Sequence, residues 1–203
     1  MGVSVTVIMP MRNAWRTMSQ SLVALGKAVA EIPIKLVIFW TEDRDSTEDV
    51  LTSDNFGASL MDLGIMDYSL KHIPSSKISN PEKQRYANLL RMWAMALEYV
   101  ETPYLMRVDS DLIIPSRSIY TLLSGMAGNS RLGEYAIAYP VTPGKPRIHN
   151  HITCGCAMFR MKALKEIAPI EMRGCDCKWI TEKLEATGWE VHKAPMTQAE
   201  HIQ

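Results

Sequence analysis

Short strand-like runs alternate along the chain with segments whose apolar residues recur at helical spacing. In residues 3–9, Ser and Thr alternate with Val, and residues 34–40 are almost continuously apolar, as in strands covered by helices on both faces. Residues 13–30 between them follow a helical pattern. The alternation predicts an α/β fold with a mostly parallel central sheet flanked by helices, with each boundary placed to within about 2–4 residues.

The clearest helix signal begins at Asn80. Asn is a favoured N-cap residue, Pro81 suits the first helical position, and the residues that follow place an apolar stripe on one face. Residues 102–103, Thr-Pro, end this helix. Residues 104–108 then predict a short strand whose carboxyl end carries the triplet 109–111, and ligands of open α/β sheets bind at that edge.

The second half of the chain continues the pattern without a linker or an internal repeat. Residues 141–150 contain Pro, Gly, Arg147 and His149 and favour a loop. We expect four regular segments around this loop: strands at 135–139, 152–159 and 189–192, and a helix at 176–187 that Gly188 ends.

Composition agrees with one folded domain over residues 1–203, since 47% of residues are apolar and 22% are charged. Lys plus Arg and Asp plus Glu both count 22, so net charge gives no general attraction to nucleic acid or anionic membrane. The sequence shows neither a signal peptide nor the roughly 20 apolar residues that cross a bilayer. We therefore expect a cytoplasmic protein without an integral membrane segment, and the oligomeric state stays open.

Asp109 and Asp111 are the strongest candidates for chemistry. Two carboxylates one residue apart, at the end of a buried strand, concentrate negative charge that a hard cation would relieve. Mn²⁺ or Mg²⁺ prefers oxygen ligands and commonly shares its shell between carboxylates and substrate phosphates. Such triplets also occur as caps and solvated turns, so the strand before the triplet is part of the argument.

Four segments resemble one enzyme family in the same chain order. The first strand contains Pro10 and is followed by Asn13, residues 85–88 read Arg-Tyr-Ala-Asn, residues 104–111 end in Asp-Ser-Asp, and residues 174–189 run from Gly-Cys-Asp to Gly-Trp. Together they resemble the nucleotide-sugar glycosyltransferases of the GT-A fold, especially family two. The resemblance implies a Rossmann-like domain with a nucleotide-sugar-binding half, residues 1–111, and an acceptor-side half, residues 112–203.

The resemblance also implies roles for individual residues. Asp109 would contact the ribose or the metal, Asp111 would ligate the metal, and His201 is similar to the late histidine that completes the metal shell in some relatives. Asp176 takes the place of the catalytic base, although Cys175 replaces the other acid of the family's pair and Asp176 could instead cap its helix. The implied donor-contacting positions are Pro10, Asn13, Asp43, Asp45, Arg85, Asn88 and Asp109.

The donor-contacting aspartate after the second strand is ambiguous in register. Asp43 fits best and Asp45 lies close behind, while a charged turn explains both residues equally well. Arg85, Arg147 and His149 would help the leaving diphosphate, although ordinary surface charge accounts for each of them.

The resemblance implies a hexosyltransferase that is metal-dependent, inverting and non-processive. It would move one sugar from a nucleotide diphosphate sugar, with a UDP-sugar favoured, to the hydroxyl of a saccharide, lipid, metabolite or modified nucleobase. The Gln-x-x-Arg-Trp signature of processive synthases is absent after Asp176, which favours transfer of a single sugar.

All four cysteines occur in two Cys-x-Cys pairs, Cys154/Cys156 and Cys175/Cys177. Four converging thiolates would form a structural Zn²⁺ site. Two residues apart on a strand, Cys154 and Cys156 would point to the same face, so buried thiols explain them without a metal. Reduced core thiols are the default expectation, because nothing indicates an oxidising compartment.

Other function classes stay open. A sugar-phosphate nucleotidyltransferase would use a similar acidic site, but residues 9–13 lack the glycines of its phosphate-binding loop. A haloacid-type phosphatase places its nucleophilic aspartate on the first strand, whereas the triplet here follows 108 residues. A non-catalytic, zinc-stabilised binding module remains an alternative, because a fold does not fix a function.

Overall fold

A computed structural model describes residues 4–29, 32–42, 45–74, 78–138, 154–171 and 174–202, apart from the side chains of Met196 and Thr197. Seven of its strands form one sheet in the order β3-β2-β1-β4-β7-β6-β8. In this sheet β7 runs antiparallel to both neighbours, and all other neighbouring pairs are parallel. The predicted α/β fold with a mostly parallel sheet is therefore confirmed. The strands are β1 (Val5–Met11), β2 (Ile34–Thr41), β3 (Asp67–Ile73), β4 (Tyr104–Val108), β6 (Leu132–Ala138), β7 (Cys156–Arg160) and β8 (Glu190–Gln198).

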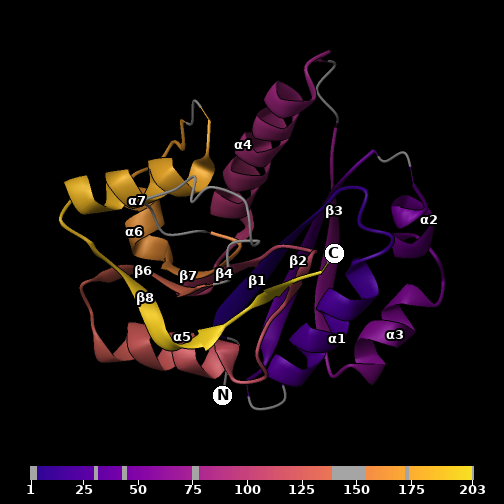
Figure 1. Cartoon of the computed structure of the whole chain (residues 1–203), viewed down its shortest axis with the longest axis horizontal. Coiled ribbons are helices and arrows are strands. Elements are labelled where there is room, and N and C mark those ends of the chain that lie inside the picture. The colour runs from indigo at the N-terminus through magenta and orange to yellow at the C-terminus, as the bar shows by residue number, and fades with distance from the viewer. Residues whose placement is uncertain are drawn as a thin grey trace, which may run out of the picture.

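Helices cover both faces of this sheet, as Figure 1 shows. One face carries α1 (Met18–Ala28), α2 (Thr47–Leu51), α3 (Phe56–Asp62) and α5 (Ser118–Gly128). The other face carries α4 (Pro81–Tyr99), α6 (Met161–Glu166) and α7 (Asp176–Ala186). A second, two-stranded sheet pairs β5 (Leu112–Ile113) with β9 (Glu200–His201).

The core consists of two apolar clusters, one on each face of the sheet. Val7 and Met9 of β1 pack in the first cluster, while Ile8 between them packs in the second with Phe39 and Trp93. Successive side chains of a strand point to opposite faces, so a strand buried on both faces must be apolar at nearly every position. This explains the continuous apolar run in β2.

Helix α4 begins as the sequence predicts. The Asn80 side chain accepts hydrogen bonds from the backbone N–H groups of Glu82 and Lys83 at 3.0 and 3.1 Å, and Pro81 occupies the first turn. The apolar stripe faces the core, where Trp93 is fully buried. In the described part of the chain, no helix combines the length and the apolar character that crossing a bilayer requires.

Two predicted boundaries are wrong for local reasons. The helix expected at 13–30 begins at Met18, because Asn13 has a left-handed φ of 50° and the chain then turns at Ala14. The strand expected from residue 152 begins at Cys156, and Cys154 lies in the turn before it. Cys154 and Cys156 therefore pack in different clusters, on opposite faces of the sheet, and not on one face as predicted.

Glu134 on β6 is an ionisable residue inside the core. It is fully buried, and its Oε2 accepts a hydrogen bond from the Thr181 hydroxyl at 3.1 Å. Its Oε1 has no hydrogen-bond partner among the described residues. Burial raises the pKa of Glu134 to about 8, although the hydrogen bond from Thr181 opposes this rise. The folded chain therefore keeps a proton on Glu134 that the unfolded chain releases at lower pH.

We expect Glu134→Gln to remove the decrease in folding stability that the wild type undergoes as pH rises. Because the ordinary pKa is 4.5 and the folded value is about 8, the wild type loses stability as pH rises through this interval. The loss is on the order of 4–5 kcal/mol at 1.36 kcal/mol per pKa unit. Glutamine accepts the same hydrogen bond without ionising. In urea unfolding, the variant should be more stable than the wild type at about pH 9 and similar to it at about pH 4.

The matched control is Glu98→Gln, which changes an exposed glutamate on α4. This control should leave the pH dependence of the wild type unchanged. If Glu134→Gln loses as much stability with rising pH as the wild type does, buried Glu134 is not the group that titrates.

Candidate active site

A cavity of about 480 Å³ opens at the edge of the sheet where β1, β2 and β4 end. Its lining comes from these strand ends, from the loop after β1, from α4 and from the segment after β9. Its volume lies within the range that small-molecule sites occupy, about 300–1,000 Å³. Six residues predicted from the sequence line it: Pro10, Asn13, Arg85, Asn88, Asp109 and Asp111.

The acidic end of the cavity brings Asp111 and His201 together. Pairing between β5 and β9 places His201 opposite Leu112, and its Nδ1 lies 3.6 Å from Asp111 Oδ2. The backbone N–H of Ile202 also donates to the Asp111 carbonyl at 2.8 Å. Burial raises the pKa of Asp111, and the nearby Asp109 raises it further, while His201 counteracts both effects. The structure thus places His201 beside Asp111, and the role of Asp109, Asp111 and His201 in holding a metal stays a prediction.

These residues suit a hard divalent cation. Asp111 is 48% exposed and Asp109 is 24% exposed, so ions from solution can reach both carboxylates. Burial and then the charge of Asp109 raise the pKa of Asp111, and a cation would oppose this rise by favouring the ionised carboxylate. Carboxylate oxygens are the ligands that Mg²⁺ and Mn²⁺ prefer, and the His201 imidazole adds a nitrogen donor.

Arg107 is a buried cation that the sequence interpretation missed. It lies on β4, is 3% exposed, and its Nε donates to Asp109 Oδ1 at 2.8 Å. Its Nη1 forms an ion pair with Asp176, whose Oδ2 also accepts a hydrogen bond from Trp93 Nε1 at 3.0 Å. Burial would lower the pKa of Arg107, but the two carboxylates raise it well above its ordinary value. An arginine inside an apolar strand was the available signal, since a buried charge needs partners.

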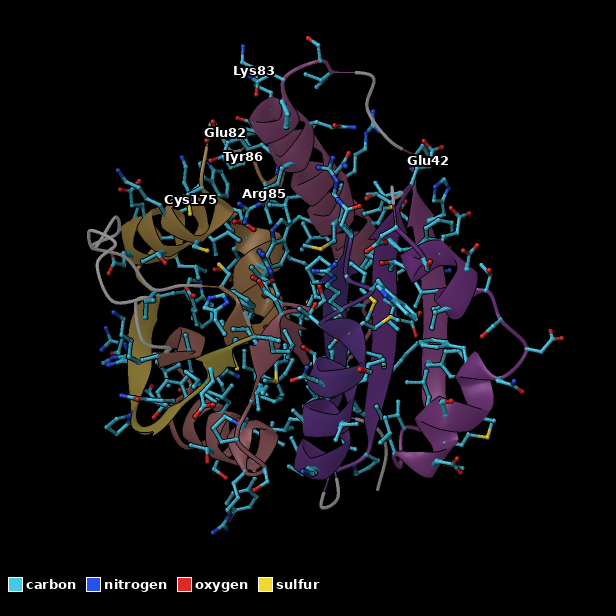
Figure 2. The ribbon with its side chains drawn as sticks, turned by 45° about the vertical axis from the view of Figure 1, so that its right-hand side comes forward. Glu42, Glu82, Lys83, Arg85, Tyr86 and Cys175 are labelled. Carbon is cyan, nitrogen blue, oxygen red and sulfur yellow. The ribbon has the colours of Figure 1, made fainter. Side chains whose placement is uncertain are left out.

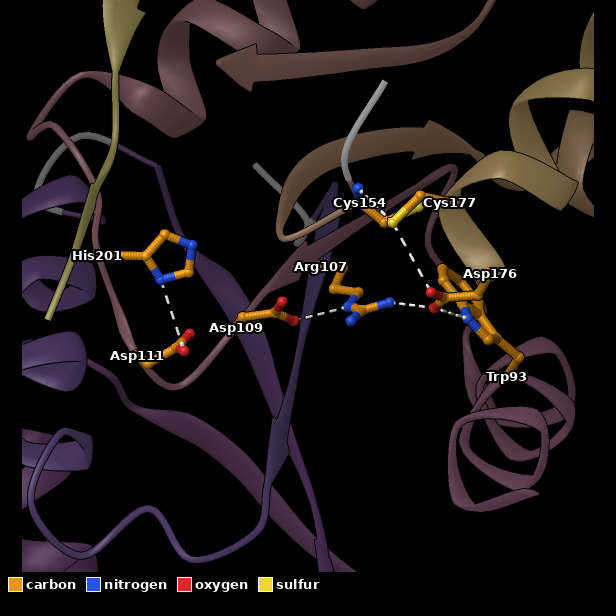
Figure 3. Close-up of polar contacts among 8 residues, drawn as sticks. All are labelled: Trp93, Arg107, Asp109, Asp111, Cys154, Asp176, Cys177 and His201. Carbon is orange, nitrogen blue, oxygen red and sulfur yellow. Dashed lines mark hydrogen bonds and ion pairs between the residues drawn. The ribbon is translucent and has the colours of Figure 1, made fainter. Parts of the chain in front are cut away.

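Asp176 lies on the far side of Arg107 from the acidic triplet, as Figure 3 shows. It is the first residue of α7, whose N-cap is Cys175, so the alternative of Asp176 as the cap is wrong. Burial would raise the pKa of Asp176, but Arg107 and the Trp93 hydrogen bond lower it. A lowered pKa makes a carboxylate a weaker proton acceptor. Its role as the catalytic base stays a prediction.

Asp45 has a structural environment outside the cavity lining. It accepts hydrogen bonds from the backbone N–H of Trp15 at 3.1 Å and from the backbone N–H and hydroxyl of Thr47 at 3.0 and 2.6 Å. These bonds tie the loop after β1 to the start of α2. Burial alone would raise the pKa of Asp45, but these hydrogen bonds lower it below its ordinary value. Asp43, Arg147 and His149 lie outside the described residues.

Cationic and polar groups complete the cavity. Arg12, Arg85 and Arg107 line it; Arg107 contacts Asp109, and the positive charge of Arg85 lies close enough to lower the pKa of Asp111. Arg85 lies on α4 at the same edge of the molecule as Cys175, which precedes α7 (Figure 2). Thr41 also lines the cavity, and its buried hydroxyl has no hydrogen-bond partner among the described residues. Neither Arg12 nor Thr41 was predicted, because their role depends on which side of the loop and strand faces the cavity.

The four cysteines do not assemble as one zinc site. Cys154, Cys175 and Cys177 lie near α7, and the Cys154 backbone N–H donates to Cys177 Sγ at 3.0 Å. Cys156 packs in the cluster on the opposite face of the sheet. The hypothesis of a four-thiolate Zn²⁺ site is therefore wrong, because the sheet separates Cys156 from the other three.

No family model and no curated protein matches the chain. Solved structures do: S. aureus TarS aligns with a TM-score of 0.68 and 14% identity, covering 98% of this chain and 37% of that one. TarS 1-349 in complex with UDP-GlcNAc gives the same TM-score and identity, with 98% and 59% covered. The mannosyltransferase PcManGT from Pyrobaculum calidifontis, in complex with GDP-Man and Mn²⁺, gives 0.68 and 13%, with 98% and 56% covered.

The chain shares its fold with these structures, which include a mannosyltransferase. It spans less than two thirds of the length of each of these structures. At 13–14% identity the similarity establishes the fold alone and leaves the activity to be argued from the site.

Proposed function

We propose that this protein transfers one sugar from a nucleotide diphosphate sugar to a hydroxyl acceptor, with a divalent metal at Asp109 and Asp111. The observation that carries the proposal is the cavity itself. It combines two carboxylates with three arginines, at the carboxyl edge of the parallel strands. This set of charges suits a diphosphate held both by a cation and by guanidinium groups.

Each group around the cavity has a distinct part in donor binding. Asp109, Asp111 and His201 would hold Mn²⁺ or Mg²⁺, which acts as a Lewis acid toward the departing diphosphate. Arg107 holds Asp109 through the 2.8 Å Nε–Oδ1 contact and so fixes the direction of that carboxylate. Arg85 supplies a further positive charge at the wall of the cavity.

The positions of these groups in the sequence support a division of the chain into a donor half and an acceptor half. Apart from Ile202, the described residues that line the cavity lie between Pro10 and Asp111, which supports residues 1–111 as the donor half. Residues 112–203 would form the acceptor side, where Asp176 is the proposed base that takes the proton from the acceptor hydroxyl. A single displacement would invert the anomeric centre, as in family-two enzymes.

Thermal unfolding with a panel of nucleotides tests the proposal. We expect UDP, GDP, UDP-GlcNAc or GDP-Man to stabilise the chain in the presence of Mn²⁺, by about 2.7 kcal/mol when the ligand is at about 100 times its Kd. UMP is the matched control, because it lacks the diphosphate and should give a smaller shift. Failure of every diphosphate to shift the unfolding temperature, or equal shifts with a metal chelator, would contradict the proposal.

A transfer assay with the donor that binds then tests the acceptor side. Asp176→Asn should keep the metal-dependent stabilisation by the donor and lose sugar transfer, since the amide cannot accept the proton. Near-normal transfer by this variant would exclude Asp176 as the base while leaving the donor site intact.

A further inference from the structure

Sulfur atoms gather beside Asp176, outside the cavity lining. The side chains of Cys175, Asp176 and Cys177 offer two sulfurs and a carboxylate oxygen that lie within 4.8 Å of one another. Cys177 Sγ lies 3.7 Å from Asp176 Oδ1. The side chain of Cys154 contacts that of Cys177, so a third thiol borders the same group. Zinc binds Cys sulfur at about 2.3 Å and carboxylate oxygen at about 2.0–2.2 Å, so ligand atoms this close together could share one ion.

The surroundings of this group resemble those of a built metal site. The second carboxylate oxygen of Asp176, Oδ2, is fixed by Trp93 and Arg107, which leaves Oδ1 on the side of the sulfur atoms. The Cys154 backbone N–H donates to Cys177 Sγ at 3.0 Å (Figure 3). Ligands of protein metals are usually oriented by such outer hydrogen bonds. The buried Arg107 also offsets part of the negative charge that thiolate ligands would add.

We propose that Cys175, Asp176 and Cys177, with Cys154 beside Cys177, form a site for a thiophilic divalent cation of the zinc class. Thiolates select soft and borderline cations, whereas carboxylates select Mg²⁺ and Mn²⁺. The protein would therefore hold two cations of different chemistry, separated by Arg107. The proposal rests on the two sulfurs and on Asp176 Oδ1, and a cation held there would exclude the base role proposed above for Asp176, whose Oδ2 is already bound by Trp93 and Arg107.

Cadmium titration of the reduced, metal-free protein tests the site. Cd²⁺ bound by thiolates gives an ultraviolet sulfur-to-metal charge-transfer band, and we expect this band to saturate at one Cd²⁺ per chain. Cys175→Ser and Cys177→Ser should each weaken Cd²⁺ binding more than about tenfold. Cys156→Ala is the matched control, since Cys156 lies on the opposite face, and it should leave the affinity unchanged.

Alkylation of the unaltered protein gives a second measurement that needs no variant to fold. Cd²⁺ should protect Cys175 and Cys177 from iodoacetamide, as peptide mass spectrometry would detect, and excess Mn²⁺ should not. Asp111→Ala should retain the charge-transfer band, which separates this site from the proposed donor site. Absence of the band, or an equal loss of affinity in Cys156→Ala and Cys175→Ser, would overturn the proposal.

Discussion

Asp111→Ala should abolish metal-dependent nucleotide binding, with UDP affinity in the presence of Mn²⁺ falling more than about 100-fold. Asp111 is the more exposed of the two carboxylates in the triplet, and His201 Nδ1 lies 3.6 Å from its Oδ2. Removal of this carboxylate takes away the group around which the proposed cation site is built. Isothermal titration calorimetry with UDP, with and without Mn²⁺, measures the effect.

The control for this experiment is Asp62→Ala, which removes an exposed carboxylate at the end of α3. It should bind UDP as the wild type does, so a general effect of lost negative charge is excluded. Unaltered UDP affinity in Asp111→Ala would show that the cavity binds nucleotides without the acidic triplet, or that the metal is held elsewhere.

Arg107→Met should destabilise the folded chain by about 3–5 kcal/mol, the cost of removing one partner from a buried ion pair. Methionine fills much of the space but leaves Asp109 and Asp176 without their shared cation. Asp176 is 5% exposed, so water cannot easily replace the guanidinium. Urea unfolding at neutral pH measures the change in the free energy of unfolding.

Arg131→Met provides a matched control for this variant. Arg131 is 73% exposed and pairs with Glu190, so its loss should cost less than about 1 kcal/mol. If Arg107→Met proves as stable as Arg131→Met, the contacts of Arg107 with the two aspartates do not contribute to stability. The charge arrangement derived for the cavity would then need revision.

The fold was predictable where local signals agree. Residues 104–108 were predicted as a strand and form β4 with the same bounds, because Pro103 precedes an apolar run and an aspartate follows it. Asn80 and Pro81 likewise marked the start of α4. Helices α2 and α3 were not assigned, since they have five and seven residues and depend on packing against the sheet.

The site was predictable only in part, for a physical reason. Asp109 and Asp111 follow from the end of a strand, but Asp176, the second partner of Arg107, lies 69 residues away in sequence. A contact between residues so far apart in sequence produces no local pattern from which it could be predicted. The cysteines illustrate the same limit, because the start of β7 at Cys156 decides which face each thiol occupies.

Strand β7, from residues 112–203, covers an edge of β4, from residues 1–111, so the first half of the chain depends on the second. β4 pairs with β1 on one side and with β7 on the other, and the Asp109 N–H donates to the Gly155 carbonyl at 2.8 Å. A polypeptide released after residue 111 would expose a bare strand edge, which is a template for aggregation. A version of this protein divided into two polypeptides must therefore keep β7 in the same polypeptide as the acidic triplet. During synthesis, the edge of β4 is covered only after β7 has left the ribosome.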